Sequence, residues 1–307
     1  MRPRANHPGR PRFTRFERKT GRSAISAILA APGSQYTDRM NLTVQLFASL
    51  AEAAGRRSID LEGLPDPATV DDISAAVFQR LPQLEELRES VIVAVNEEYV
   101  RGAFPVRAKD EVALIPPVSG GEHRPPVSGG ENRSPDSGGE HHSPSGDEEQ
   151  SAPDRGEDDP HFLVTDQPLD VQALHEFVLC PQAGAVSLFV GVVRDNNLGR
   201  NVDYLEYEAY PPMAVTKMRE IAAELRERWT VSDVAMQHRT GRLEIGEASV
   251  AIAVSSPHRK EGIEACHYAI DRLKQIVPVW KKEVWTDGES WIEGSLAPQD
   301  EAKPAPD

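Results

Sequence analysis

The sequence has little that would define a disulfide scaffold, a metal centre or a membrane span. Its 307 residues include only two cysteines, Cys180 and Cys266, which form neither a disulfide framework nor a metal-ligand spacing. We expect both to be ordinary buried thiols in a reducing cytoplasm. No run approaches the roughly 18 apolar residues of a membrane-spanning helix. Hydrophobic residues make up only 39% of the chain, which indicates that part of it lies outside any packed core.

Positive charge is also scarce, with 34 Lys and Arg against 49 Asp and Glu and a net charge of −15. This balance argues against nucleic acid as a general partner. Residues 1–39 are strongly basic, and their Arg-rich composition is similar to that of an organelle transit peptide. The apolar run "SAISAILAA" is short for a signal peptide and precedes no convincing cleavage site. We expect residues 1–39 to be a disordered extension, or to precede the true start of the protein, for which Met40 is the natural candidate. We expect the protein to be cytoplasmic.

From residue 41 to 115 the patterns predict the order ββαββ, which is typical of a β-grasp domain. The runs "LTVQLF", "RSIDLEG", "SVIVAV" and "DEVALI" have the character of strands. "DPATVDDISAAVFQRL" predicts an amphipathic helix with Thr69 as its N-cap. A turn is expected at Asn96-Glu97. Pro116 and Pro117 should stop the last strand, because proline cannot donate to a β-ladder.

A second α/β segment begins near residue 162, so that the chain as a whole belongs to the α+β class. "DVQALHEFVL", "PPMAVTKMREIAAELRERW" and "KEGIEACHYAIDRLKQIV" predict helices. "GAVSLFVGVV" predicts a buried strand, "VDYLEYEAY" an alternating one, and "SDVAMQHRTGRLEIGEASVAIAVSS" two or three more. "VWKKEVWTDGESWIEG" predicts closing strands around an Asp-Gly turn.

A nine-residue repeat, "PPVSGGEHRPPVSGGENRSPDSGGEHH", begins at Pro116 between these segments. The acidic, Pro- and Gly-rich residues 122–160 predict a disordered linker. A Ca²⁺-binding β-solenoid is excluded because the copies lack the required acids and a recurring apolar position. Gly120-Gly121 in the first copy would suit a slim tail that enters a narrow channel. Taken alone, the pair is better explained as part of a flexible linker.

A second set of candidate residues is basic and follows the ends of predicted elements. Arg, Lys and His side chains grouped in an acidic protein suggest an anion site. A lysine in such a group could also act in proton transfer or as a nucleophile. Each residue taken separately is more often a solvated surface charge, and periodicity does not show that they converge. The set comprises Arg194, His258, Arg259, Lys274, Lys281 and Lys282, with Glu283 beside them.

Together these motifs resemble molybdopterin synthase, with both subunits in one chain. Residues 40–121 resemble the small, ubiquitin-like sulfur carrier (MoaD-like) through "LFASLAEAAG", "TVDDI", "VAVNEEYV" and "DEVALIPPVSGG". Residues 161–294 resemble the large catalytic subunit (a MoaE-like hammerhead fold) through "GAVSLFVGVVRDNNLGR", "YEAYPPMA", "HRTGRLEIGE", "SSPHRKEGIEAC", "LKQIVPVWKKE" and "DGESWIEG". Residues 122–160 would be the linker and 295–307 a flexible tail.

The resemblance implies a sulfurtransferase that needs no metal or resident cofactor. An E1-like enzyme would adenylate the terminal Gly121, and a sulfur donor would convert it to a thiocarboxylate. The tail would then deliver sulfur to cyclic pyranopterin monophosphate, making the dithiolene of molybdopterin. Lys274 and Lys281 would be catalytic, and the catalytic domain would form a homodimer with carriers at its two ends. The implied substrate-binding residues are Phe189, Val192 (where many relatives carry Thr), Val193, Arg194, His258, Arg259, Lys282 and Glu283.

The fusion creates a chemical problem, because Glu122 follows Gly121 and an internal glycine has no free carboxylate. We therefore predict that a processing protease cuts after Gly121. A cut after Gly130 would leave a longer, charged tail that is less suited to a channel. Two alternatives remain open. The chain could be the precursor of a non-catalytic carrier or protein modifier with a scaffold domain, or an inactive fusion, including one produced by gene prediction.

Overall fold

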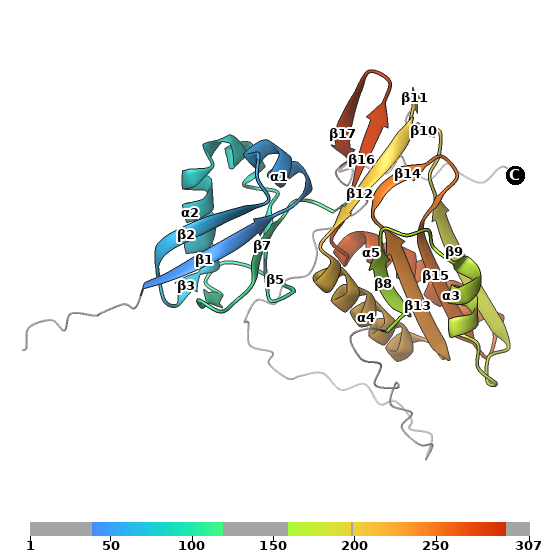
Figure 1. The fold of residues 1–307 in the computed structure, drawn as a ribbon. Coiled ribbons are helices and arrows are strands. Elements are labelled where there is room, and N and C mark those ends of the chain that lie inside the picture. Colours follow the sequence, from blue (N-terminus) through green and yellow to red (C-terminus); the bar gives the residue numbers. More distant parts are fainter. Residues whose placement is uncertain (1–38, 119–158, 198, 293–307) are drawn as a thin grey trace, which may run out of the picture. The chain divides into compact units, whose positions relative to one another are not determined.

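The computed structural model describes residues 39–118, 159–197 and 199–292. These residues form a β-grasp domain and a larger α/β domain (Figure 1), and both lie within one compact unit. The predicted basic extension, the Gly-Gly repeat with Gly120 and Gly121, most of the linker and the C-terminal tail lie outside the described residues. Among the helices that the structure describes, none is long and apolar enough to cross a membrane.

The first domain is a five-stranded sheet with one main helix packed on it, in the strand order β2-β1-β7-β4-β5. Strands β1 and β7 pair in parallel at the centre, and the other pairs are antiparallel. The strands are β1 (Arg39–Leu46), β2 (Ser58–Pro65), β4 (Ile92–Val95), β5 (Glu98–Val100) and β7 (Val112–Ile115). The helices are α1 (Ala48–Ala54), α2 (Val70–Arg80) and the 3₁₀ helix η1 (Pro82–Leu87), and β3 (Ala68–Thr69) pairs with β6 (Pro105–Val106).

The start of α2 confirms the predicted N-cap. The Thr69 hydroxyl accepts a hydrogen bond from the Asp72 amide at 3.1 Å, and the Asp72 carboxylate accepts one from the Thr69 amide at 2.9 Å. This reciprocal capping box satisfies two amides that the first turn of a helix leaves free. The helix then buries Ile73, Val77 and Phe78 against the sheet. The local sequence thus determines where α2 begins, and packing against the core determines which face of α2 is buried.

The predicted turn between β4 and β5 is also present. Asn96 and Glu97 both have left-handed backbone conformations, with φ values of 50° and 67°. Val95 and Glu98 pair directly across the strands, so the connection is a two-residue hairpin of the type that matches the natural twist of a β-ribbon. The hairpin presents two consecutive acidic side chains, Glu97 and Glu98, at its tip.

The second domain is built on a four-stranded sheet in the order β8-β13-β15-β9, with helices on both faces (Figure 1). Alternate residues of β13 and β15 point to opposite faces. Met236 and Ile252 face α4 and α5, whereas Ala235 and Ala253 face α3. The elements are β8 (Phe162–Thr165), α3 (Val171–Phe177), β9 (Ala185–Val192), α4 (Pro211–Arg228), β13 (Asp233–Arg239), β15 (Ala248–Ser256) and α5 (Arg259–Ile276).

A second, smaller sheet in this domain has the order β14-β12-β16-β17. Its last two strands form the hairpin that the Asp-Gly turn predicted, with Trp285 paired to Gly288. The strands are β12 (Tyr204–Ala209), β14 (Gly241–Glu244), β16 (Val279–Trp285) and β17 (Gly288–Ile292), and β10 (Asn196–Asn197) pairs separately with β11 (Arg200–Asn201).

Two expectations about burial were wrong. Among the described strands, β9 lies at an edge and pairs with β15 alone, and its side chains at Leu188 and Val192 are 45% and 53% exposed. Its composition indicates a buried strand, but α3 packs only near its start at Val186, and Leu188, Val190 and Val192 further along the described strand are exposed. Cys180 is partly exposed, whereas Cys266 is buried, and burial raises the pKa of the Cys266 thiol to about 11.

One buried histidine makes the stability of the second domain dependent on pH. His238 lies in β13 with its ring edge against Tyr207, and its Nδ1 donates to the Arg239 carbonyl at 2.8 Å. Burial lowers the pKa of His238 to about 4. Below the ordinary pKa of about 6.5, the unfolded chain binds a proton that the folded chain refuses.

We therefore predict that the free energy of unfolding falls by about 3 kcal/mol between about pH 7 and pH 4 through His238, and that the slope from this residue vanishes above about pH 7.5. Urea unfolding of the wild type and of His238→Phe at a series of pH values tests this. The substitution keeps an aromatic ring against Tyr207 but removes the titrating group. An unchanged slope in the variant would show that other groups carry the pH dependence.

Candidate active site

The end of the β-grasp domain contacts the junction between α5 and β16. The Tyr99 hydroxyl donates to the Ile276 carbonyl at 3.0 Å, and the Trp280 indole donates to the Pro116 carbonyl at 3.1 Å. Both bonds are buried, so each satisfies polar groups that would be costly to leave unpaired. Because Pro116 follows β7 directly, the segment that leaves this domain starts out beside Trp280.

An apolar cluster surrounds these two hydrogen bonds. Phe47 stacks on Tyr210 and Trp280 with ring centroids 5.0 and 5.3 Å apart. Burial of large aromatic side chains contributes much of the free energy of such contacts. Residues of both domains form the cluster, namely Ala48, Ile92, Ala94, Tyr99, Ala113, Ile115, Tyr210, Met213 and Trp280, with Phe47 and Trp291 at its margin.

The two lysines predicted to be catalytic flank this junction in the sequence. Lys274 is exposed in the last turn of α5, two residues before Ile276. The helix ends at Ile276, before Pro278, as predicted. Lys281 follows Trp280 in β16, and its Nζ lies 3.0 Å from the buried carboxylate of Glu283. Glu283 therefore holds Lys281 in place on one face of the strand.

A second contact orients the same carboxylate. The Asn197 side-chain amide donates to Glu283 at 2.8 Å and thereby ties the β10–β11 ribbon to β16. The predicted ligand-binding residue Glu283 is thus 2% exposed and engaged by two side chains of its own domain. Its proposed contact with substrate stays a prediction.

Lys282 lies on the opposite face of β16, because side chains alternate along a strand. Its ammonium contacts Glu52 of the β-grasp domain at 2.7 Å and Glu289 of its own domain at 2.8 Å. Burial opposes the charged form, but the hydrogen bonds to Glu289 and Glu52 outweigh it, so the pKa of Lys282 is raised. Hydrogen bonds from Lys282 and Trp291 lower the pKa of Glu52. Lys282 is thus a domain-contact residue, and its predicted binding of substrate remains untested.

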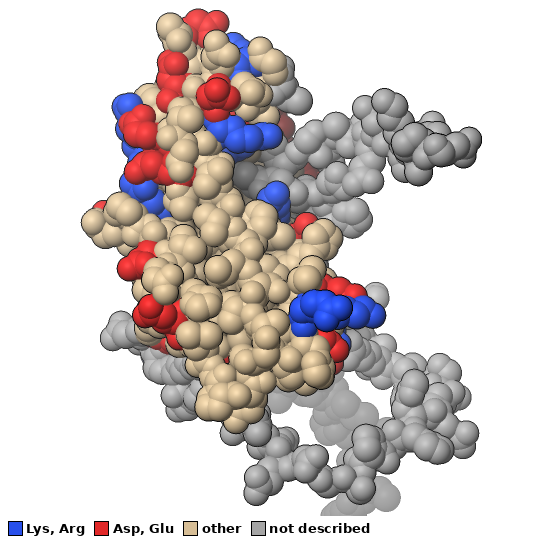
Figure 2. Space-filling view, turned by 90° about the vertical axis from the view of Figure 1, so that its right-hand side faces the viewer, with Lys and Arg blue, Asp and Glu red and all other residues tan. Residues whose placement is uncertain are grey.

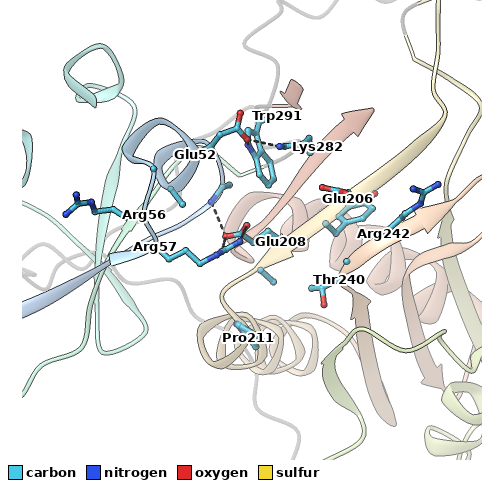
Figure 3. A pocket seen from close by; sticks show the side chains of 16 residues that line it. Glu52, Arg56, Arg57, Glu206, Glu208, Pro211, Thr240, Arg242, Lys282 and Trp291 are labelled. Carbon is cyan, nitrogen blue, oxygen red and sulfur yellow. Dashed lines mark hydrogen bonds and ion pairs between the residues drawn. The ribbon is translucent and has the colours of Figure 1, made fainter. Parts of the chain in front are cut away.

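A polar cavity of about 750 Å³ adjoins this contact (Figure 3). Arg57 binds Glu208 across it with both guanidinium nitrogens, at 2.8 and 3.2 Å. The Ala48 amide also donates to Glu208 at 3.1 Å. Among the predicted site residues that the structure describes, Lys282 alone lines this cavity. The cavity therefore belongs to the contact between domains rather than to the predicted catalytic lysines.

The structure separates two groups of predicted ligand-binding residues. Arg194 follows β9 at the end where Val192 pairs with Ala248. His258 and Arg259 follow β15 at the other end, where Ser256 pairs with Ala185. Strand β9 has eight residues, which rise about 3.3 Å each. Arg194 therefore lies about 25 Å from His258 and Arg259. Helix α5 returns from His258 across the sheet, so Lys274 in its last turn lies toward the Arg194 end.

The remaining predicted residues lie on β9 or just after it. Phe189 packs among the helices and strands of the core, and Val193 is buried against Val202 and Leu243. Val192 is exposed. Contact of these three residues with substrate remains a prediction. Within the residues that the structure describes, no cluster of three or more His, Cys, Asp or Glu could hold a metal ion.

Comparison with known proteins assigns each domain to a family. Residues 44–121 match the ThiS family, and residues 164–276 match the MoaE protein family. The molybdopterin synthase catalytic subunit of Halalkalibacterium halodurans is 49% identical over 135 residues, which cover 44% of this chain and 86% of that protein. The Bacillus subtilis catalytic subunit is 50% identical with the same coverage.

Two solved structures are similar to parts of the chain. Molybdopterin synthase from Staphylococcus aureus is 45% identical in sequence. The alignment covers 43% of this chain and 96% of that chain, with a TM-score of 0.42. SAMP1 from Haloferax volcanii is 35% identical in sequence. The alignment covers 26% of this chain and 99% of that chain, with a TM-score of 0.24.

The chain is therefore a two-domain protein that joins a ThiS-type β-grasp domain to a MoaE domain. It belongs to the molybdopterin synthase catalytic subunit family of molybdenum cofactor biosynthesis, which confirms the resemblance seen in its motifs. The contacts made by Glu52, Arg57, Glu208 and Trp291 had no signal in the sequence, because each partner lies on the other domain.

Proposed function

We propose that this chain carries out the whole sulfur transfer of molybdopterin synthase. Its carrier domain would bring sulfur as a thiocarboxylate on Gly121 to cyclic pyranopterin monophosphate. The observation that supports this most directly is the hydrogen bond from Trp280 to the Pro116 carbonyl. Trp280 lies between Lys274 and Lys281 in the sequence. Gly121 follows Pro116 by five residues, a reach of about 16 Å in an extended chain. We propose that the tail uses this reach to approach the two lysines.

In the proposed reaction each transfer forms a carbon–sulfur bond between the thiocarboxylate and the substrate and breaks a carbon–oxygen bond of the substrate. The displaced oxygen leaves as water or stays on the phosphate as the cyclic phosphate opens. Water then cleaves the acyl–sulfur bond and returns Gly121 as an ordinary carboxylate. A second loaded carrier repeats the step, and the two sulfurs make the dithiolene. Lys274 and Lys281 would supply protons and stabilise developing negative charge, and Arg194 would bind the cyclic phosphate. No step needs a metal or a resident cofactor.

A second copy of the chain is the proposed partner of the exposed face of β9. Seen from the side of Figure 1 on which β9 and α3 are drawn, the surface has a broad area without charged residues (Figure 2). Leu188, Val190 and Val192 are exposed in a row on β9. An apolar row on an edge strand is a liability unless another chain covers it. A two-fold axis that sets two β9 strands antiparallel would bring Arg194 of one copy to the His258 end of the other.

Mixing two inactive variants tests this composite site. We expect Arg194→Glu and His258→Glu to be nearly inactive alone. In a mixed dimer, one of the two sites then combines an intact Arg194 with an intact His258. Random mixing should therefore restore roughly a quarter of wild-type activity. If the site lay within a single chain, the mixture would stay as inactive as either variant.

The proposed function as a whole is tested by reconstitution. Residues 40–121, thiocarboxylated at Gly121, are combined with residues 160–307 and cyclic pyranopterin monophosphate. We expect molybdopterin to form in proportion to the thiocarboxylate consumed, two per product. The same carrier with an ordinary glycine carboxylate is the control. Absence of product with loaded carrier, while the domains still bind each other, would reject the catalytic proposal in favour of a scaffold.

A further inference from the structure

A buried lysine on α4, Lys217, makes a further contact with the β-grasp domain. The side chain of Lys217 is only 4% exposed. Its ammonium lies 2.7 Å from Glu98 of the carrier domain and 2.6 Å from Glu220 of its own helix. It also lies 5.8 Å from the centre of the Tyr99 ring. A positive charge is thus enclosed at the domain contact by one carboxylate from each side.

The neighbouring residue makes a parallel contact. The Thr216 hydroxyl donates to the carboxylate of Glu97. Two consecutive residues of α4 therefore bind two consecutive acids at the tip of the β4–β5 hairpin. The left-handed conformations of Asn96 and Glu97 fix the direction of both acidic side chains. The contact depends on the shape of the turn as well as on its charge.

The two carboxylates around Lys217 differ in their origin. Glu220 is three residues along the same helix, so it accompanies Lys217 whether or not a carrier is bound. Glu98 arrives only with the carrier. Docking removes water from the ammonium, and an ammonium without sufficient partners in such a site is costly. Burial, together with the nearby charge of Glu98, outweighs the attraction of Lys217 and raises the pKa of Glu220. A carrier without Glu98 would bury the ammonium with Glu220 as the remaining carboxylate of the pair.

We propose that Lys217 and Thr216 form a selectivity site that accepts β-grasp carriers with an acidic pair in the β4–β5 turn and rejects carriers without it. Its partner is the chain's own carrier domain or a free carrier with the same turn. The site acts chiefly by penalising wrong carriers, because only they leave the buried ammonium short of a carboxylate. It would let the enzyme distinguish its own carrier from other ubiquitin-like proteins that end in Gly-Gly. The proposal rests on the proposed function only in treating the β-grasp domain as a carrier.

A double-mutant cycle in the full-length chain tests the site. Opening of the domain contact is measured by hydrogen exchange of the Ala48 amide, which donates to Glu208 across the contact. We expect Glu98→Gln to raise the open fraction about tenfold, which corresponds to the loss of one hydrogen bond between charged groups. In a Lys217→Met background, which keeps the length of the side chain but removes its charge, the same Glu98→Gln change should have almost no effect.

The matched control is Glu62→Gln, which removes another exposed acid of the carrier domain. It should leave Ala48 exchange unchanged in both backgrounds. The proposal is overturned if Glu98→Gln opens the contact equally with Lys217 and with Met at that position, or if it opens the contact in neither. The readout is exchange rather than product, so it stays informative even if the chain makes no molybdopterin. Conversely, a failed cycle leaves the reconstitution assay unaffected.

Discussion

Replacing Lys274 with alanine should lower molybdopterin formation at least a hundredfold while leaving the fold intact. A positioned group that transfers a proton contributes about 10² to 10⁴ in rate. Lys274 lies in the last turn of α5, two residues before the Ile276 carbonyl that binds Tyr99 of the carrier. Because its side chain is exposed, its removal creates no cavity and should change the melting temperature little. Single-turnover reconstitution with loaded carrier measures the effect directly.

The matched control lies at the other end of the same helix. Lys260 is exposed in the first turn of α5, so Lys260→Ala removes the same charge and the same number of atoms. We expect it to retain wild-type turnover. Lys274→Arg separates charge from proton transfer, and we expect it to restore little of the rate. Turnover near the wild-type level in Lys274→Ala would exclude the proposed role.

Blocking the cut after Gly121 should abolish activity completely, because an internal glycine offers no carboxylate to adenylate. The substitution Glu122→Pro places proline directly after the proposed cleavage site and should keep the chain whole. We expect intact-mass analysis of the wild type from its native host to show a fragment that ends at Gly121, and the variant to show neither fragment nor product. A full-length chain that remains uncut and active would contradict this proposal.

A split chain provides the control for this experiment. Residues 40–121 and 160–307, expressed together, carry a free Gly121 and need no protease. They should be active in cells where the Glu122→Pro chain is inactive. Equal inactivity of both would indicate that the defect lies in the sulfur supply rather than in cleavage.

Local signals in the sequence predicted most of the elements and several of their ends. Thr69 with Asp72 marks the start of α2, and Asn96-Glu97 marks a hairpin, because each depends on residues within a few positions of each other. The strand β9 was misjudged for the opposite reason. Whether an apolar strand is central or at an edge depends on which other strands pair with it, and a period of two residues carries no such information.

The candidate site was predicted as a set of residues but not as an arrangement. The basic residues after β9 and β15 belong to neighbouring strands, yet the antiparallel register sets Arg194 and His258 at opposite ends. The domain contacts escaped prediction because they join distant residues such as Glu52 and Lys282. Pairing of charges across two folded surfaces depends on their docking, which local patterns do not encode.

The alternation of Lys281 and Lys282 along β16 limits how this strand can change length. Lys281 turns to Glu283 of its own domain, and Lys282 turns to Glu52 of the carrier. A single residue inserted after Trp280 would send each lysine to the other's face, so that chemistry and carrier docking would fail together. Two inserted residues would restore both orientations. Insertions in this segment should therefore be tolerated only in even numbers.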